Sequence, residues 1–164
     1  MEIQVIGQAR TAWSRRQDAP HQPRAAAEVV GEILVEEPFR AALADLESFK
    51  RIWVIFLFHQ STGFAPRVKP PRGGPKRGVL ATRAPNRPSQ IGLSCVELVA
   101  VDVSSGVVRA AGLDLLNETP VLDLKPYLPE VDSFPEAGHG WLDAFRAAGI
   151  EPRLKKPFQP PRSK

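Results

Sequence analysis

The side chains most able to bind a charged ligand in this 164-residue chain are cations gathered in its middle. No acidic residue lies between Glu47 and Glu97, whereas nine of the 22 lysines and arginines do. The remainder holds 13 basic and 18 acidic residues and has a net charge of −5. Clustered cations concentrate an anionic ligand and gain affinity by releasing counterions. The cluster predicts a surface for a phosphate-rich or otherwise anionic partner; a solvated loop with a chance bias is the alternative. Its members are Lys50, Arg51, Arg67, Lys69, Arg72, Lys76, Arg77, Arg83 and Arg87.

Several other chemistries find no support in the sequence. The glycine-rich run 73–78 fits neither a phosphate-binding loop nor a dinucleotide site, no Gly-x-Ser-x-Gly elbow occurs, and no Cys/His cluster has zinc spacing, so no metal is expected. The single cysteine, Cys95, cannot form an internal disulfide, and we expect it to be buried and inert. No signal peptide is apparent, and the longest apolar run, 52–58, is far below the roughly 20 residues of a membrane span. We expect a soluble, cytoplasmic protein.

The elements that must position these groups are short. Hydrophobic residues make up 43% of the chain, enough for a packed core, and one domain is usual at this length. The 17 prolines disfavour long helices and interior strands. We expect one domain over residues 1–150 and a basic, proline-rich tail over 151–164.

Hydrophobic patterning predicts about seven strands and two short helices. The strands are expected near residues 3–5, 29–35, 51–58, 79–81, 93–101, 107–115 and 121–124. The run 51–58 should be the buried central strand, with Trp53 in the core. Helices are expected after Pro38 and at 141–148, where Trp141 packs the helix and Gly149 caps it; 12–24 and 59–78 should be loops. Two helices cannot supply the crossovers of a parallel sheet. The predicted fold is therefore mostly β, a small, largely antiparallel β-barrel with long ordered loops.

Several longer strings in the sequence identify a protein family more specifically than its hydrophobic periodicity does. In chain order they are 16–17 (RQ), 52–60 (IWVIFLFHQ), 69–72 (KPPR), 80–88 (LATRAPNRP), 91–94 (IGLS), 113–115 (LDL) and 119–127 (TPVLDLKPY). Together, over residues 1–148, they closely resemble the TrmO family. That resemblance implies a β-barrel methyltransferase that uses S-adenosylmethionine to methylate N6 of threonylcarbamoyladenosine, next to the anticodon of a tRNA. It also implies a homodimer, with cofactor sites near the subunit boundary.

The resemblance also assigns site residues. The cofactor would be held at Arg15, Arg16, Gln17, His59, Gln60, Arg83, Leu93, Leu113, Asp114, Leu115 and Leu116. We expect the tRNA to be contacted by Arg67, Lys69, Arg72, Lys76, Arg77, Arg87, Lys125 and Tyr127. The target nitrogen has a delocalised lone pair and must lose its proton before or during transfer. His59, Asp114 and Asp123 are candidates for the base, and the sequence does not choose among them.

Structural roles compete with these assignments. Arg83 and Arg87 could brace the proline-rich turn by donating to carbonyl oxygens, and Asp123 with Lys125 could form an ion pair on an edge strand. Tyr127 could stack on a base or only cap the barrel. His59 could end its strand, bonded to backbone.

Three departures from the family pattern bear on the substrate. Arg15 stands where many members have proline, Ser89-Gln90 replaces Asn-Pro, and 116–118 (LNE) replaces a common Val-Asp-Gly. Two other functions therefore stay open: a methyltransferase of this fold acting on another anionic substrate, and a non-enzymatic RNA-binding β module.

Overall fold

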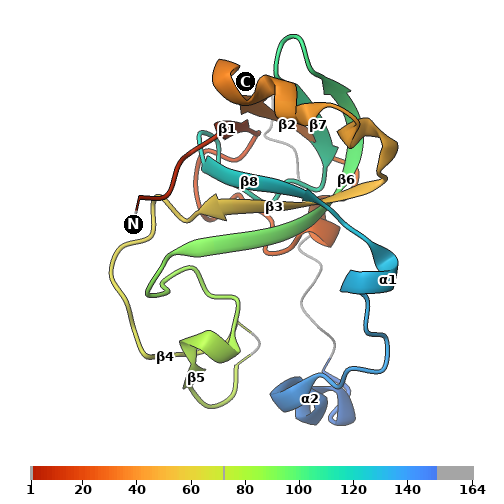
Figure 1. Ribbon diagram of the computed structural model, residues 1–164. Helices are drawn as coiled ribbons and strands as arrows, with labels where there is room; N and C mark the ends of the chain where they lie inside the picture. The colour runs from red at the N-terminus through yellow and green to blue at the C-terminus, as the bar shows by residue number, and fades with distance from the viewer. Residues whose placement is uncertain (1, 72, 151–164) are drawn as a thin grey trace, which may run out of the picture.

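The protein is a closed antiparallel barrel, seen in a computed structural model that describes residues 2–71 and 73–150 (Figure 1). Every neighbouring pair of strands is antiparallel, which confirms the predicted fold class. Around the barrel the strands run β1 (Gly7–Arg10), β2 (Val30–Val35), β7 (Val107–Ala111), β6 (Ile91–Asp102), β3 (Arg51–Leu57) and β8 (Pro120–Pro126).

Strand β3 is central, as its sequence predicts. It pairs with β6 on one side and β8 on the other. Ile52, Val54 and Phe56 alternate into the interior and are almost fully buried. Burial of such a side chain contributes about 1.5–3 kcal/mol, so this strand anchors the core. The expectation for Trp53 was wrong, because it lies on the outer face, half-buried, where its indole N–H donates to Asp132.

The N-terminal strand begins later than predicted. Residues 3–5 form no strand, and β1 starts at Gly7. A Cβ atom at Gly7 would lie 2.2 Å from the Leu34 carbonyl oxygen, so the close approach of β1 to β2 requires glycine there. The alternation of apolar and polar residues, on which the prediction of a strand at 3–5 was based, does not reveal this requirement for glycine.

Short 3₁₀ helices replace several predicted elements. The segment after Pro38 is the 3₁₀ helix η2 (Glu37–Leu43) rather than an α-helix, and the expected strand at 79–81 is η4 (Val79–Ala81). A two-stranded hairpin, β4 (Arg67–Val68) with β5 (Arg77–Gly78), lies within the expected loop 59–78. The other single turns are η1 (Pro23–Ala26), η3 (Leu46–Ser48) and α1 (Pro129–Asp132).

The second predicted helix is present as η5 (Gly140–Leu142) followed by α2 (Asp143–Ala147), with Gly149 left-handed at φ 67°. It lies away from the barrel, on the side of the hairpin β4–β5 (Figure 1). The Trp141 ring packs edge-on against Phe145, as predicted, and its N–H donates to the Ala81 carbonyl at 2.8 Å. Among the described residues, no helix is long and apolar enough to cross a membrane.

Candidate functional site at one end of the barrel

Strand register gathers the sequence-predicted site segments at one end of the barrel. Leu57 at the end of β3 pairs with Ile91 at the start of β6, and β7 ends opposite the start of β2. Strand β8 begins beside the end of β3, and β1 ends beside the start of β2. The segments 11–29, 58–90 and 112–119 therefore all leave or enter the barrel at this end, which we call the open end.

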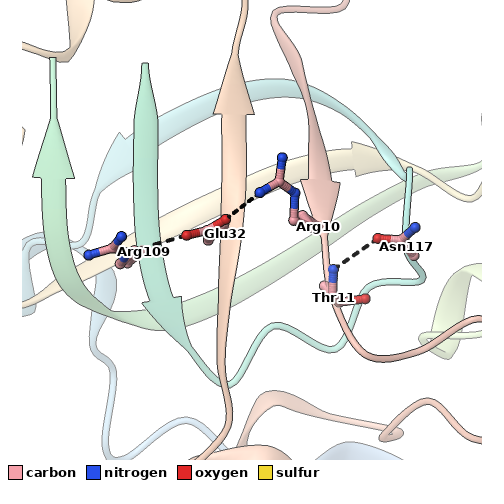
Figure 2. A network of polar contacts seen from close by, with 5 residues as sticks. All are labelled: Arg10, Thr11, Glu32, Arg109 and Asn117. Atoms are coloured by element: carbon pink, nitrogen blue, oxygen red, sulfur yellow. Dashed lines mark hydrogen bonds and ion pairs between the residues drawn. The ribbon is translucent and has the colours of Figure 1, made fainter. Parts of the chain in front are cut away.

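Hydrogen bonds fix two of these segments to each other. Thr11 Oγ1 donates to the Leu115 carbonyl at 2.8 Å, and the buried Trp13 indole N–H donates to the Leu113 carbonyl at 2.9 Å. The Thr11 amide donates to Asn117 Oδ1 at 3.1 Å, as Figure 2 shows. The segment 113–117 is thus clamped against 11–13, which places Arg15–Gln17, two residues further on, beside the same end.

Asp114 lies at the centre of this arrangement. Its Oδ1 accepts a 2.6 Å hydrogen bond from the Ser94 hydroxyl, a buried group on β6. Burial raises the pKa of the Asp114 carboxyl from 3.8 to about 6, and the Ser94 hydrogen bond and the charge of Arg83 offset only part of that rise. A carboxyl group with this pKa is a stronger proton acceptor than an ordinary aspartate and is still ionised at neutral pH.

Arg83 and His59 border the same region. The Arg83 guanidinium donates to Gln22 Oε1 at 3.0 Å and attracts the Asp114 carboxylate. The His59 Nδ1 lies 3.4 Å from the hydroxyl of the buried Thr119. Of the three candidate bases, His59 and Asp114 therefore lie at the open end.

Asp123 does not face the barrel interior, although it lies in the same cross-strand row as Leu93, because both residues pair with Ile55. Strand β8 places it on the outer face of the barrel, opposite Ile55, where its carboxylate pairs with Lys125 Nζ at 2.8 Å. The neighbouring carboxylate raises the pKa of Lys125. The ion pair considered for these two residues is present, but β8 is not an edge strand, because it pairs with both β1 and β3 in the closed barrel.

Some of the predicted RNA-contacting residues are exposed to solvent, and others are engaged in contacts within the protein. Arg67, Lys69 and Lys76 are exposed on or beside the hairpin β4–β5. Arg77 is half-buried instead, with its guanidinium 5.2 Å from the Trp141 ring centroid. Arg87 Nη1 donates to the carbonyls of residues 79, 82 and 84, the bracing role considered for it. Arg72 lies outside the described residues.

Two other predicted residues lie on outward-facing surface. Leu93 on β6 is 49% exposed, next to the open end. Tyr127 follows the far end of β8, away from the open end, and contacts Trp53 edge-on. Cys95 is half-buried rather than buried, and burial raises the pKa of its thiol.

The local geometry explains one departure from the family pattern. Glu118 has φ 62°, a left-handed conformation that glycine adopts without strain, and it stands where the family commonly has glycine. Asn117 replaces aspartate but keeps the side-chain oxygen that accepts the Thr11 amide. Asn117 therefore keeps segment 113–117 bonded to Thr11, while Glu118 carries backbone strain.

Sequence reasoning missed the supporting side chains of this site. Gln22 and Thr11 lie outside the family strings, while Ser94 and Thr119 lie within them without having been assigned a role, and the partners of all four are far apart in the chain. A second network on the outer face joins Glu32 of β2 to Arg10 of β1 at 3.1 Å and to Arg109 of β7 at 3.3 Å (Figure 2). These exposed pairs tie three strands together but contribute little stability each.

Known proteins are similar to this chain in sequence and in fold. Residues 8–133 match the family described as tRNA-methyltransferase O N-terminal domain. The tRNA (adenine(37)-N6)-methyltransferase of Escherichia coli K12 is 37% identical over 155 residues, which cover 90% of this chain and 66% of that protein. A probable S-adenosyl-L-methionine-binding protein of Methanothermobacter thermautotrophicus is 38% identical over 135 residues, covering 81% of this chain and 96% of that protein.

Solved structures of the same family are also similar to this chain. The crystal structure of TrmO from Pseudomonas aeruginosa has a TM-score of 0.71 and 35% identity, over 86% of this chain and 62% of that one. The chain spans 61–66% of the length of several curated relatives that it matches. The family model covers most of the barrel, and these identities extend across it. The chain belongs to the tRNA-methyltransferase O (TrmO) family, as its sequence strings predicted.

Proposed function

We propose that this protein is an S-adenosylmethionine-dependent methyltransferase that modifies N6 of threonylcarbamoyladenosine next to the anticodon of a tRNA. The observation that carries the proposal is the half-buried Asp114 carboxyl at the open end, with its raised pKa and its neighbour Arg83. The names of the E. coli and M. thermautotrophicus relatives support the reaction and the cofactor.

The residues at the open end suit this cofactor. Its methionyl part carries a carboxylate, for which Arg15, Arg16 and Gln17 supply donors on the loop beside the clamp. Leu93 and Leu116 offer apolar surface for the adenine. The backbone of 113–116, held in place by Thr11 and Trp13, offers peptide groups at fixed positions. His59 and Gln60, at the end of β3, would border the other side.

The chemistry needs alignment, exclusion of water and a proton acceptor. When bound, S-adenosylmethionine supplies an electrophilic methyl group and requires no metal. We assign Asp114 as the acceptor of the N6 proton, because its raised pKa makes the carboxylate more basic and Ser94 holds one of its oxygens in place. His59 is then left to orient the site through Thr119.

Electrostatics supports an anionic nucleoside as the substrate. Threonylcarbamoyladenosine carries its own carboxylate, and Arg83 is the arginine placed beside Asp114. A guanidinium there can pair with the substrate carboxylate while Gln22 holds its other edge. The exposed Arg67, Lys69 and Lys76 supply phosphate contacts at a distance from the reacting groups.

We further propose that the enzyme acts in the cytoplasm as a homodimer. Ile91 and Leu93 on the outer face of β6 are 37% and 49% exposed, and Ile55 lies directly opposite Leu93 on β3. Apolar surface next to the open end suits a second subunit that would complete the cofactor site. Analytical ultracentrifugation of the wild type and of Leu93→Glu would show a dimer for the first and a shift to monomer for the second.

The proposed function is tested by binding and by turnover. S-adenosylmethionine at a large excess over its dissociation constant should raise the melting temperature by several degrees. Labelled methyl groups should then appear in tRNA that carries threonylcarbamoyladenosine and remain absent from tRNA that lacks it. An unchanged melting temperature would rule out both methyltransferase hypotheses. A stabilised protein that leaves the modified tRNA unlabelled would point to a different substrate.

A further inference from the structure

Two neighbouring residues at the open end, His59 and Gln60, are presented by a tight turn. The Ser61 amide donates to the Phe58 carbonyl at 2.8 Å, which closes a four-residue β-turn with His59 and Gln60 at its centre. We call residues 58–61 the histidine turn. Both central residues are exposed, so a ligand at the open end can reach them. Their positions therefore depend on what holds the two ends of this turn.

Gln90 holds both ends of the histidine turn. Its backbone carbonyl accepts the Phe58 amide at 2.8 Å, and its side-chain Nε2 donates to the Ser61 carbonyl at 2.9 Å. Asn86 supports the segment one residue further on, where its Nδ2 donates to the Thr62 carbonyl at 2.8 Å. A single residue, Gln90, thus fixes the turn at its start and at its end.

The barrel in turn fixes Gln90. This residue directly precedes Ile91, the first residue of β6, which pairs with Leu57, the last residue of β3. Gln90 and the histidine turn are therefore the first residues beyond two paired strands. Site residues that are supported by such rigid elements are held more precisely than residues on an unsupported loop.

The backbone of Gln90 is strained. Its φ is 51°, in the left-handed region, which glycine, asparagine and aspartate enter more easily than glutamine does. Such conformations persist where the surrounding contacts require them, and they are frequent at ligand sites. The hydrogen bonds that oppose this strain are those to the histidine turn and one from the Gln90 amide to the Arg87 carbonyl at 3.3 Å.

The proline that the family pattern has at this position could not replace Gln90 in this structure. Proline is fixed near φ −65°, so it cannot adopt the left-handed conformation. It also lacks the side-chain amide that donates to Ser61. The support of the histidine turn by this side chain is therefore particular to a chain with glutamine at position 90.

We propose that Gln90 is a positioning residue for the cofactor, because its side-chain bond to Ser61 holds His59 and Gln60 where they contact S-adenosylmethionine. This inference rests on the proposed function for the role of His59 and Gln60. Loss of the bond would let the histidine turn adopt more conformations, and ordering the turn would then oppose cofactor binding.

The test separates the Gln90 side chain from its strained backbone. Gln90→Asn suits a left-handed residue but is too short to reach the Ser61 carbonyl, and Gln90→Gly removes the strain and the side chain together. Asp45→Gly is the matched control, because Asp45 has φ 66° and precedes η3 at the opposite end of the barrel. Calorimetric titration of each full-length variant measures the dissociation constant of S-adenosylmethionine, and thermal unfolding without cofactor measures stability.

We expect Gln90→Asn and Gln90→Gly to weaken cofactor binding about three- to tenfold, the effect of one lost hydrogen bond. Their melting temperatures should stay within about 3 °C of wild type, because relief of the strain offsets the lost bond. Asp45→Gly should bind the cofactor as wild type does. Wild-type affinity in Gln90→Asn would overturn the proposal, and so would a loss of affinity that comes only with a large fall in melting temperature.

A double-mutant cycle shows whether Gln90 acts through the histidine turn. In His59→Ala/Gln60→Ala the contacts that Gln90 positions are absent, so adding Gln90→Asn should weaken binding less than twofold. A further loss as large as that in the wild-type background would contradict a positioning role. Cofactor binding that depends on Gln90 as expected, in a protein that methylates no tRNA, would confirm the positioning role and remove the proposed substrate.

Discussion

The Ser94 hydroxyl donates a 2.6 Å hydrogen bond to the Asp114 carboxylate at the open end of the barrel. The pair joins β6 to the segment after β7 and holds a carboxylate where burial raises its pKa to about 6. At neutral pH the folded protein therefore keeps an ionised group that burial destabilises. Such a cost is typical of functional sites, where stability and activity conflict.

Replacing Asp114 with asparagine should stabilise the fold at alkaline pH. The folded pKa, about 6, lies above the ordinary value of 3.8, so folding takes up a proton between these values. The aspartate's contribution to stability is greatest below pH 4 and is lost as the pH rises through 6. Asparagine keeps an acceptor for Ser94 without the charge. We expect a gain of about 1–3 kcal/mol at pH 8 and almost none at pH 4, measured by denaturant unfolding.

Asp123→Asn is the matched control for that measurement, because Asp123 is a half-buried aspartate on the outer face that is paired with Lys125. Its substitution should leave the free energy of unfolding nearly unchanged at both pH values. A gain for Asp114→Asn that is equal at pH 4 and pH 8 would contradict the raised pKa.

Methyl transfer should depend on the ionisation of Asp114. If this carboxylate accepts the N6 proton, kcat/KM should rise with pH through about 6 and level off above it. Asp114→Asn should lower kcat about 10²–10⁴-fold and remove this inflection, while Asp123→Asn stays within twofold of wild type. A pH profile that keeps its inflection in Asp114→Asn would move the role of base to another group, His59 first.

The backbone strain at Glu118, the left-handed residue of the segment bonded to Thr11, can be relieved by substitution. Glu118 has φ 62°, and its amide donates to the Ala9 carbonyl at 2.7 Å, an arrangement that glycine keeps without strain. Glu118→Gly should therefore raise stability by about 0.5–1 kcal/mol, observed as a higher melting temperature. Glu36→Gly, at an extended residue with φ −65°, is the control and should not stabilise. Destabilisation by Glu118→Gly would show that the glutamate side chain has a role of its own.

Two adjacent cations of the hairpin should behave differently. Lys76 is exposed, so Lys76→Ala should weaken tRNA binding and lower the slope of log K against log salt by about 0.7–0.9. Arg77 packs over Trp141, so Arg77→Ala should lower stability by about 1 kcal/mol, with faster amide exchange around residues 74–82. A reduced salt slope for Arg77→Ala without loss of stability would instead assign Arg77 to the RNA.

The barrel could be predicted from sequence because its central strand is a long run of β-branched and aromatic residues and several other strands alternate apolar with polar residues. Every second side chain is buried along β3 and along the first half of β6, and the lack of long helices leaves antiparallel pairing as the simplest solution. The start of β1 could not be predicted in this way, because it depends on how closely Gly7 approaches Leu34. The turn at 79–81 could not be predicted either, since its carbonyls accept hydrogen bonds from the side chain of Arg87, eight residues after Val79, and from that of Trp141, 60 residues after Ala81.

The candidate site was predictable only in part, for a similar reason. Family strings named Arg83, Asp114 and His59 as site residues, but they did not show which side chains hold these residues in place. Those partners, such as Gln22 and Ser94, are 61 and 20 residues away in sequence and follow no periodicity. Only the closure of the barrel brings them together.

The most direct test of the proposed function is mass spectrometry of nucleosides from tRNA treated with the purified protein and S-adenosylmethionine. The tRNA should carry threonylcarbamoyladenosine, with the same tRNA lacking that modification as the control. We predict that threonylcarbamoyladenosine is converted to a species heavier by one methyl group, located on N6 by fragmentation, and that Asp114→Asn leaves it unconverted. Unconverted nucleoside in the presence of wild-type protein that demonstrably binds S-adenosylmethionine would contradict the assignment of this substrate.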